Sequence, residues 1–473
     1  MKKLTMLFLI MFCLTIFTYT AEKEWTVMVY ICGDNDLDQA MFLDVNEMEK
    51  IGSSENVNII VLHDRFSGEF EYGSNGTVER PAENKGMKIY YIEKDNDMRK
   101  INSKDITADL GFTAGMFDAG SAQNLEKFIK AAMENYPAKK YHLDIGTHGG
   151  GIYAINTDYT SDTRMTLGNR TANSLSAALG RVFGNLVARI QERNADMKLD
   201  VLSFDACLMS MLEVYNEIAQ HKVDFGVASE QSIPGYGFVY DDILNGLSEK
   251  TPENHTKYMV QSFSNEYAQG AHLASIKLDK DNLSTLAGHL GTFFELSNRA
   301  FESLKEKDEE YGQILMKEFH KELRDIRKFD IDDFVDIVDF VNKMSANDFF
   351  KKILEKDDLQ NLIKNTHNMN IVANGHGYRD SRAWKESVNG LSMYMPQYKL
   401  TIYARQTEDG PQIVRVTSNG NLSYANTLRN FDFASTKMYT EADKFVTNYL
   451  TTMETVENAF FDLDKDAIIR WIE

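Results

Sequence analysis

WTVMVYI at residues 25–31, followed by GDND at 33–36, opens the part of the chain that decides the fold. The first run is almost continuously apolar and rich in β-branched and aromatic residues, which predicts a strand buried on both faces. The second run supplies turn and helix-capping residues. The helix expected next carries its apolar stripe on Leu37, Met41, Val45 and Met48. A buried strand that leads into an amphipathic helix is typical of a parallel α/β unit.

The same alternation continues to about residue 229. Further strands are predicted over 57–62, 87–92, 141–145, 199–204 and 224–229, and helices over 122–136, 172–193 and 208–219. This order predicts an α/β fold whose mostly parallel central sheet is covered on both faces. After about residue 280, helical patterns dominate up to residue 365, and short strands are predicted at 369–373, 390–395 and 400–405. We therefore expect one α/β domain over 22–280 and a mixed α/β region over 281–473, part of which may complete the sheet.

Residues 1–21 have the order of a secretory signal peptide. Lys2 and Lys3 precede an apolar run over 4–17, and a short polar exit ends at Ala21. The run is too short for a membrane span, and no later stretch approaches about 18 apolar residues. The mature chain is therefore expected to be exported without a transmembrane anchor: secreted, periplasmic or on the cell surface of a bacterium. Lipidation at Cys13 is the alternative, but the preceding residues 10–12 lack the small residue expected there.

Charge and cysteine content exclude two classes of protein. The chain has 71 acidic and 51 basic residues, a net charge of −20, so nucleic acid is not an expected partner. The acidity fits a solvated surface, or the steering of cationic peptides. Once the signal peptide is removed, Cys32 and Cys207 are the cysteines that remain. A disulfide framework therefore does not hold this fold together, although a single Cys32–Cys207 bridge stays open.

Two predicted strands end in chemically useful residues. The first leads into Gly146-Thr147-His148-Gly149-Gly150-Gly151, and the second into Asp205-Ala206-Cys207. Open α/β sheets bind ligands at the carboxyl ends of their strands. A lone histidine is usually structural and a free cysteine is usually an inert core residue. Together, however, the two strand ends converge on one crevice, where a cysteine and a histidine can meet.

The chemistry of such a pair follows from the residues. Cys207 is expected at the start of a helix, whose positive end would lower the pKa of the thiol and favour the nucleophilic thiolate. His148 would take the thiol proton and return it to the leaving amine. The N–H groups of Gly149 and Cys207 would bind the oxyanion.

His-Gly closing one strand and Asp-Ala-Cys closing a later one resemble the clan of caspases, legumain, gingipain and clostripain. Three further stretches resemble the clostripain family: VMVY at 27–30 running into DNDL at 34–37, ASE at 228–230 with IPG at 233–235 and Gly237, and GLSMYMP at 390–396. The resemblance covers roughly residues 25 to 400. It implies a caspase-like α/β/α sandwich and a cysteine endopeptidase whose Cys207–His148 dyad needs no third residue. Protein or peptide substrates are the implied partners.

The resemblance also implies cleavage after Arg or Lys, with Asp205 lining the specificity pocket and Ser229 and Glu230 beside the substrate. A buried carboxylate discriminates a guanidinium or ammonium well. The other interpretation of Asp205 is an N-cap of the following helix. Tyr236 departs from the family, in which a short polar or acidic residue is common, and this weakens a strict basic preference. Cys32 stands where a small residue is usual; if it lies near Cys207, oxidation of the pair could switch the enzyme off.

Relatives are often activated by cleavage between the two catalytic strands. The polar stretch 158–170 contains Arg164 and Arg170, and we expect this zymogen to process itself there, preferably after Arg164. A second His-Gly pair, at His376, is expected in a surface loop.

No cofactor is required by the sequence, and calcium enters by family resemblance alone. Asp34, Asp36 and Asp38 imitate the start of a calcium loop, but position six is Gln39 and position twelve is Val45, so they give no ligand set. No His/Cys spacing indicates zinc. The metal content, the oligomeric state and the physiological substrate stay open. The alternatives to this peptidase are a non-catalytic surface or binding protein on the same fold, or a peptidase of the same clan with non-basic specificity.

Overall fold

The structure is a computed structural model. It describes residues 22–66, 86–184, 197–353, 356–367, 371–407, 410–418 and 423–463. The expected signal peptide and Cys13 lie outside these residues. Among the described helices, none is both long and apolar enough to cross a membrane.

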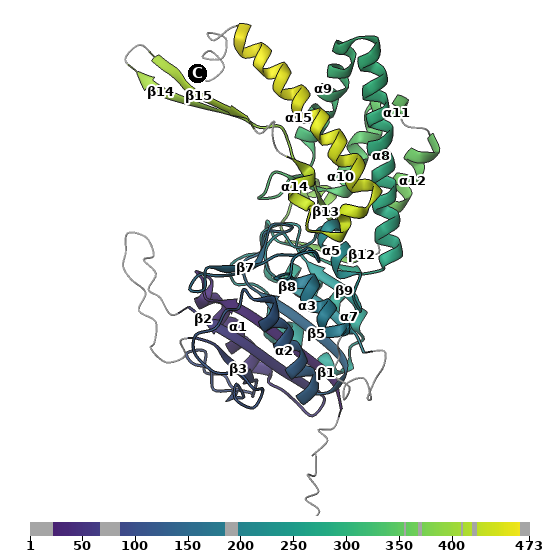
Figure 1. Cartoon of the computed structure of the whole chain (residues 1–473). Coiled ribbons are helices and arrows are strands. Elements are labelled where there is room, and N and C mark those ends of the chain that lie inside the picture. Colours follow the sequence, from purple (N-terminus) through teal and green to yellow (C-terminus); the bar gives the residue numbers. More distant parts are fainter. Residues whose placement is uncertain are drawn as a thin grey trace, which may run out of the picture.

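A nine-stranded sheet forms the centre of the molecule (Figure 1), in the order β12-β10-β9-β8-β5-β1-β2-β3-β4. Its middle five strands run parallel, and the strands at both edges are antiparallel, so the expected mostly parallel sheet is confirmed. The parallel strands are β1 (Lys23–Gly33), β2 (Val57–Arg65), β5 (Ala138–Gly146), β8 (Leu199–Asp205) and β9 (Val223–Ala228). The edge strands are β3 (Lys88–Tyr91), β4 (Lys104–Asp105), β10 (His272–Lys277) and β12 (Ile371–His376).

Both faces of the sheet are buried, which explains the continuous hydrophobicity of its strands. Met28, Tyr30 and Cys32 of β1 lie in one apolar cluster, with α2 (Ala122–Asn135), α3 (Leu175–Gly184) and α5 (Leu212–Ile218). Val27, Val29 and Ile31 face a second cluster, formed with α1 (Asp38–Ile51), α6 (Tyr240–Leu244) and α7 (Pro252–Glu266). Successive residues of a strand point to opposite faces, so each strand serves both clusters.

The C-terminal part is mainly helical and packs at one end of the sheet (Figure 1). Its longest helices, α8 (Lys280–Lys307) and α15 (Lys437–Leu463), pack against each other. The remaining elements are α9 (Glu309–Asp325), β11 (Phe334–Asp336), α10 (Ile337–Ala346), α11 (Asp348–Ile353), α12 (Lys356–His367), α13 (Arg382–Ser387), β13 (Ser392–Tyr394), β14 (Leu400–Thr407), β15 (Gly410–Ser418) and α14 (Tyr424–Leu428). Because β12 pairs with β10, this part also contributes an edge strand to the main sheet.

Three expected elements differ. The helix predicted over 172–193 is described as α3 to Gly184, beyond which 185–196 lie outside the described residues. The helix predicted from residue 208 begins at Leu212 instead. His376, expected in a surface loop, is the last residue of β12, and its Nε2 donates to the carbonyl of Val388 (2.8 Å). The loop was predicted because the pair follows Cys207 in the sequence and lacks a run of glycines, but this His-Gly pair also closes a strand.

Candidate active site

The register of the sheet brings the two expected strand ends together. Gly146, the last residue of β5, pairs with Asp205, the last residue of β8, and the N–H of Thr147 donates to the Asp205 carbonyl (3.1 Å). His148 and Cys207 each follow that pair by two residues. Gly149 lies so close that a Cβ placed on it would be 2.3 Å from the Cys207 carbonyl oxygen and 2.9 Å from its nitrogen. The absence of a side chain at Gly149 therefore lets the two segments touch through their backbones.

His148 is held by a carboxylate from a third strand end. Its Nε2 lies 2.6 Å from Oδ1 of Asp36, in the loop between β1 and α1, and the Tyr159 hydroxyl donates to the same oxygen (3.1 Å). Partial burial acts to raise the pKa of Asp36, but the hydrogen bond and charge of His148 and the bond from Tyr159 together keep that pKa below its ordinary value. An ionised Asp36 fixes the Nε2–H tautomer, which leaves the lone pair on Nδ1.

Cys207 is not at a helix N-terminus, which corrects the expectation. It lies in a turn, and α5 begins five residues later. Burial raises the pKa of the thiol above its ordinary value, although the N–H of Ile233, 3.3 Å from Sγ, acts in the opposite direction. The expected lowering of the thiol pKa by a helix N-terminus is therefore wrong, because the helix that follows Cys207 begins only at Leu212.

Asp205 is buried behind Cys207, with 2% of its surface exposed. Its Oδ2 accepts hydrogen bonds from the N–H of Phe238 (2.9 Å) and the hydroxyl of Tyr240 (3.1 Å). Gly237, at a φ of 61°, lies against the same carboxylate, and a Cβ there would be 2.3 Å from Oδ2. The N-cap interpretation of Asp205 is wrong, because the residue that caps α5 is Met211.

Further acids lie behind Asp205. The Tyr240 hydroxyl also donates to Oδ2 of Asp144 (2.7 Å), and Oδ2 of the buried Asp44 has no hydrogen-bond partner among the described residues. Burial and the neighbouring Asp205 raise the pKa of Asp144 to about 7, and burial raises the pKa of Asp205 to about 6. These groups form a buried acidic site, and an incoming cation would favour the ionised forms of its carboxyl groups.

The segment after β9 contributes backbone more than side chains. Ser229 and Glu230 are fully buried. Oε2 of Glu230 accepts the N–H of Gly390 (2.7 Å), which directs that side chain toward the C-terminal part and not toward the thiol. Tyr236 is 73% exposed. In this segment the backbone of Ile233 and the side chain of Ser232 both contact the thiol of Cys207.

The other expected residues lie around the site. Cys32 is a free, fully buried thiol, and Cys207 is free as well, so the structure holds no bridge between them. Arg164 is exposed in β7 (Thr163–Met165), which forms a hairpin with β6 (Ile155–Asp158), where a polar loop was expected. Arg170 is exposed, and its guanidinium lies 3.6 Å from Asp432.

Sequence reasoning missed Asp36, Ile233 and Tyr240 as site residues. Asp36 belongs to the DNDL stretch, where the spacing of the aspartates imitates the start of a calcium loop. Ile233 belongs to a stretch that resembles the clostripain family. No sequence pattern indicates a role for Tyr240 in the site. Their roles depend on loop conformation, which periodicity does not predict.

Comparison with known proteins gives both a family and a fold. The sequence model of the clostripain family matches residues 29–442. Clostripain from Hathewaya histolytica is 29% identical over 239 residues, which is 48% of this chain and 42% of that protein. The chain thus matches less than half the length of that curated relative.

Two solved structures share the fold at 18% identity and a TM-score of 0.53 each. One is an inactive zymogen C11 protease from Parabacteroides distasonis, covering 80% of this chain and 93% of that one. The other is a secreted C11 cysteine protease from Bacteroides thetaiotaomicron in complex with an irreversible peptide inhibitor. That match covers 89% of this chain and 99% of the other chain. The expected caspase-like α/β/α fold is thereby confirmed.

Proposed function

This chain belongs to the clostripain family, and from that premise we propose that it is an exported cysteine endopeptidase with Cys207 as nucleophile and His148 as its proton-transfer partner. The observation that carries the proposal is the register of β5 and β8, which pairs Gly146 with Asp205 and so sets His148 and Cys207 at equivalent places beyond adjacent strands. A cysteine and a histidine that meet at the carboxyl edge of a parallel sheet form a nucleophile and base.

In the proposed reaction, Nδ1 of His148 takes the proton of the Cys207 thiol as the sulfur attacks the substrate carbonyl. The N–H groups of Gly149 and Cys207 donate no hydrogen bond among the described residues and are available to the developing oxyanion. The imidazolium then protonates the leaving amine, giving a thioester. Water, deprotonated by the same imidazole, releases the acid and regenerates the thiol.

We further propose that the substrate residue before the cut is Arg or Lys, bound by Asp205. Burial raises the pKa of Asp205, and burial together with repulsion from Asp205 raises the pKa of Asp144. A guanidinium or ammonium that reaches these acids would relieve the repulsion, whereas an apolar side chain would not.

Such binding requires a movement. The turn over 234–237 lies on the Asp205 carboxylate, with the N–H of Gly237 bonded to the carbonyl of Pro234 (2.9 Å). We propose that this turn shifts when substrate binds or when the chain is processed between its catalytic strands. Export follows from the expected signal peptide and is in keeping with the secreted relative from Bacteroides thetaiotaomicron.

The test is a panel of short fluorogenic peptides that differ only in the residue before the cut, together with an Arg-derived acyloxymethyl ketone probe. We expect turnover after Arg and Lys, and labelling that disappears in Cys207→Ala but persists in Cys32→Ala. Labelling that survives in Cys207→Ala would reject the nucleophile. Turnover after non-basic residues alone would reject Asp205 as the discriminator while keeping the peptidase.

A further inference from the structure

A buried chain of hydrogen bonds leads from α7 into the centre of the sheet. Nε2 of His255 lies 3.1 Å from Nδ1 of His142, and Nε2 of His142 lies 2.8 Å from Oγ of Ser203. The Ser203 hydroxyl donates to Oδ1 of Asp144. Each of these residues is 2% exposed or less. The chain therefore ends, shielded from solvent, on the carboxyl group that lies behind the proposed specificity pocket.

A single hydroxyl joins Asp144 to Asp205. The phenol oxygen of Tyr240 lies 2.7 Å from Oδ2 of Asp144 and 3.1 Å from Oδ2 of Asp205. A hydroxyl has one hydrogen, so it donates to one carboxyl group at a time. Both contacts are hydrogen bonds only when the other carboxyl group carries a proton and donates it to the phenol oxygen. Without a bound cation, the two acids therefore share one proton through Tyr240.

The two histidines keep that proton on the side of Tyr240. Burial lowers the pKa of both imidazoles, that of His142 to about 3, so both rings are neutral and each carries one hydrogen. Nδ1 of His255 has no hydrogen-bond partner among the described residues. A hydrogen there would be a buried donor without an acceptor, so it lies on Nε2, and every group of the chain donates toward Asp144. Oδ1 of Asp144 receives the Ser203 hydrogen, which leaves Oδ2 to hold the titrating proton.

No basic side chain among the described residues offsets the two acids. Lys50 of α1 is bonded to Asp241 (2.7 Å). Burial, followed by the charge of Asp205, raises the pKa of Asp144 to about 7. The other titratable groups that face the pair are acidic or neutral: Asp44 and Glu47 of α1, and Tyr267 after α7.

From this geometry we propose that Asp144 is a positioning residue for the cationic substrate side chain, acting through Tyr240, and that binding of Arg or Lys beside Asp205 expels the shared proton. In that step the O–H bond of Asp144 breaks as its proton passes to the phenol oxygen, the phenol hydrogen passes to Asp205, and Asp205 gives a proton to water. Asp144 is then ionised and accepts from both Ser203 and Tyr240. The inference rests on the proposed preference for Arg or Lys.

The sign of the effect follows from charge. A guanidinium beside Asp205 favours the ionised form of Asp144, whereas an apolar side chain brings no charge and leaves the proton in place. Below its pKa, Asp144 must lose a proton before the cation binds fully, so affinity for the cation rises with pH and levels off above about pH 7.

The test uses the active, full mature chain and a cation that it cannot cleave. The probe is acetyl-leucyl-agmatine, which ends in the arginine side chain with no carbonyl group beyond it, and acetyl-leucyl-pentylamide is its apolar counterpart. Inhibition constants (Ki) are measured against the best peptide of the substrate panel between pH 6 and pH 8, where the guanidinium stays charged. We expect the Ki of the agmatine compound to fall about tenfold and that of the pentylamide to stay level. Calorimetry in two buffers of different ionisation enthalpy counts the released proton.

Two variants separate a positioning role from a structural one. Asp144→Asn keeps the shape and removes the titrating proton, so its Ki should change less than about threefold between pH 6 and pH 8. It should match the parent at pH 6 and be about tenfold weaker at pH 8, whereas a structural defect would weaken binding equally at both. Ser203→Ala removes a donor to the ionised Asp144, so the fall in Ki should move about one pH unit upward.

Asp200→Asn and Ser275→Ala are the matched controls. Asp200 is a buried acid at the opposite end of β8, and Ser275 is a buried serine of β10 whose hydroxyl has no partner in the described part of the chain. Both variants should keep the pH dependence of the parent.

Two kinds of failure are distinguishable. A parent Ki that does not change with pH, the same pH dependence for the pentylamide, or parent-like behaviour of Asp144→Asn would overturn the proton release and leave the basic preference standing. An agmatine compound that does not inhibit an enzyme active on the panel would overturn the basic preference, and the inference with it.

Discussion

At the scale of single residues, Asp36 has the clearest mechanistic position. Its carboxylate accepts from Nε2 of His148 at 2.6 Å, with 49% of the Asp36 side chain exposed. Replacing it by asparagine keeps the size but removes the charge that fixes the imidazole tautomer. We expect kcat to fall about 10- to 100-fold with KM nearly unchanged, less than for a fully buried carboxylate in the same role. Steady-state kinetics on the best peptide of the substrate panel would measure both constants.

Tyr159→Phe is the control for that variant, because it removes the hydrogen bond from the Tyr159 hydroxyl to Asp36 and leaves the His148 contact intact. It should change kcat by about twofold or less. A rise in KM alone for Asp36→Asn would make Asp36 a substrate contact, and unchanged kinetics would remove it from the mechanism.

The raised pKa of the Cys207 thiol predicts how the rate of its alkylation depends on pH. Burial raises its pKa, so the neutral thiol persists to higher pH than in an exposed cysteine, and the thiolate appears only above the ordinary range. In an Arg164→Ala/Arg170→Ala chain, chosen to stay unprocessed, alkylation of Cys207 by iodoacetamide should be slow at neutral pH and still be accelerating at pH 9. Mass spectrometry of the labelled peptide measures the rate, with the buried Cys32 as the unlabelled internal reference. A plateau already reached at pH 7 would contradict the raised pKa.

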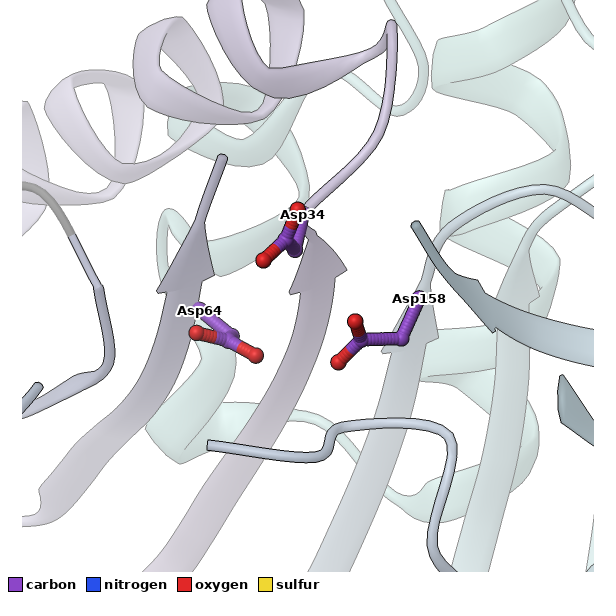
Figure 2. Close-up of side chains that lie close together, drawn as sticks. All are labelled: Asp34, Asp64 and Asp158. Atoms are coloured by element: carbon purple, nitrogen blue, oxygen red, sulfur yellow. The ribbon is translucent and has the colours of Figure 1, made fainter. Parts of the chain in front are cut away.

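The placement of His148 and Cys207 beyond adjacent strands was predictable from the sequence, because the carboxyl ends of parallel strands lie at one edge of the sheet. Their roles as base and nucleophile stay a prediction. The bond between Asp36 and His148 could not be predicted, since it depends on how the loop after β1 folds toward the loop after β5. The close approach of the Asp34, Asp64 and Asp158 carboxylates (Figure 2) was not predictable either, because it also depends on how the loops fold.

At the scale of elements, the segment after β8 shows why the helix prediction failed. Apolar residues at helical spacing continue through 208–219, yet Leu208 has a φ of 65°, which a helix does not accommodate. Tertiary contacts decide instead: the N–H of Leu208 donates to Gln231 (3.1 Å), and that of Ser210 donates to Ser229 (3.0 Å). These bonds to the segment after β9 hold Cys207 in a turn ahead of α5, away from its N-terminus.

The glycines after β5 test how tightly the two strand ends must approach. A Cβ at Gly149 would lie 2.3 Å from a backbone oxygen of Cys207, so Gly149→Ala must displace the backbone of one strand end. We expect a loss of about 1–3 kcal/mol in the free energy of unfolding and a large fall in kcat. Gly150→Ala is the control, because its nearest neighbour would be 3.7 Å away, and it should stay within about 0.5 kcal/mol. Urea unfolding followed by circular dichroism gives both values. Equal stability of the two variants would mean that the strand ends lie further apart.

At the scale of the whole molecule, the C-terminal part is connected to the segment that bears Cys207. Two buried glutamates of α5 make the connection: Glu213 accepts the N–H of Tyr394 (2.9 Å), and Glu217 accepts those of Phe433 (2.8 Å) and Asn169 (2.9 Å). The parallel sheet and the helical C-terminal part were predictable from the periodicity of apolar residues and from composition. The sequence indicated that some part of the C-terminal region could complete the sheet, but not that β12 does so. The hydrogen bonds of Glu213 and Glu217 were not predictable, because they join positions far apart in the sequence. The boundary near residue 280 stays a prediction.

Processing is the last consequence of this arrangement. Arg164 and Arg170 are both exposed, but Arg170 is tied to the C-terminal part through its N–H to Asn430 (2.9 Å) and its guanidinium near Asp432 (3.6 Å). Arg164 lies in a three-residue strand of a small hairpin, which opens locally at lower cost. We expect purified wild-type chain to convert into two fragments cut after Arg164, Arg164→Ala to slow that conversion at least about tenfold, and Arg170→Ala to leave it nearly unchanged.

Gel analysis with N-terminal sequencing of the new fragment measures the rate and the site of that conversion. Cys207→Ala should remain a single chain on its own and should be cut after Arg164 when a trace of active enzyme is added, because the scissile bond is intact and only the nucleophile is missing. Two fragments in freshly purified Cys207→Ala would assign the cut to another protease. A wild-type cut after Arg170 would mean that the contacts with Asn430 and Asp432 open more readily than the hairpin does.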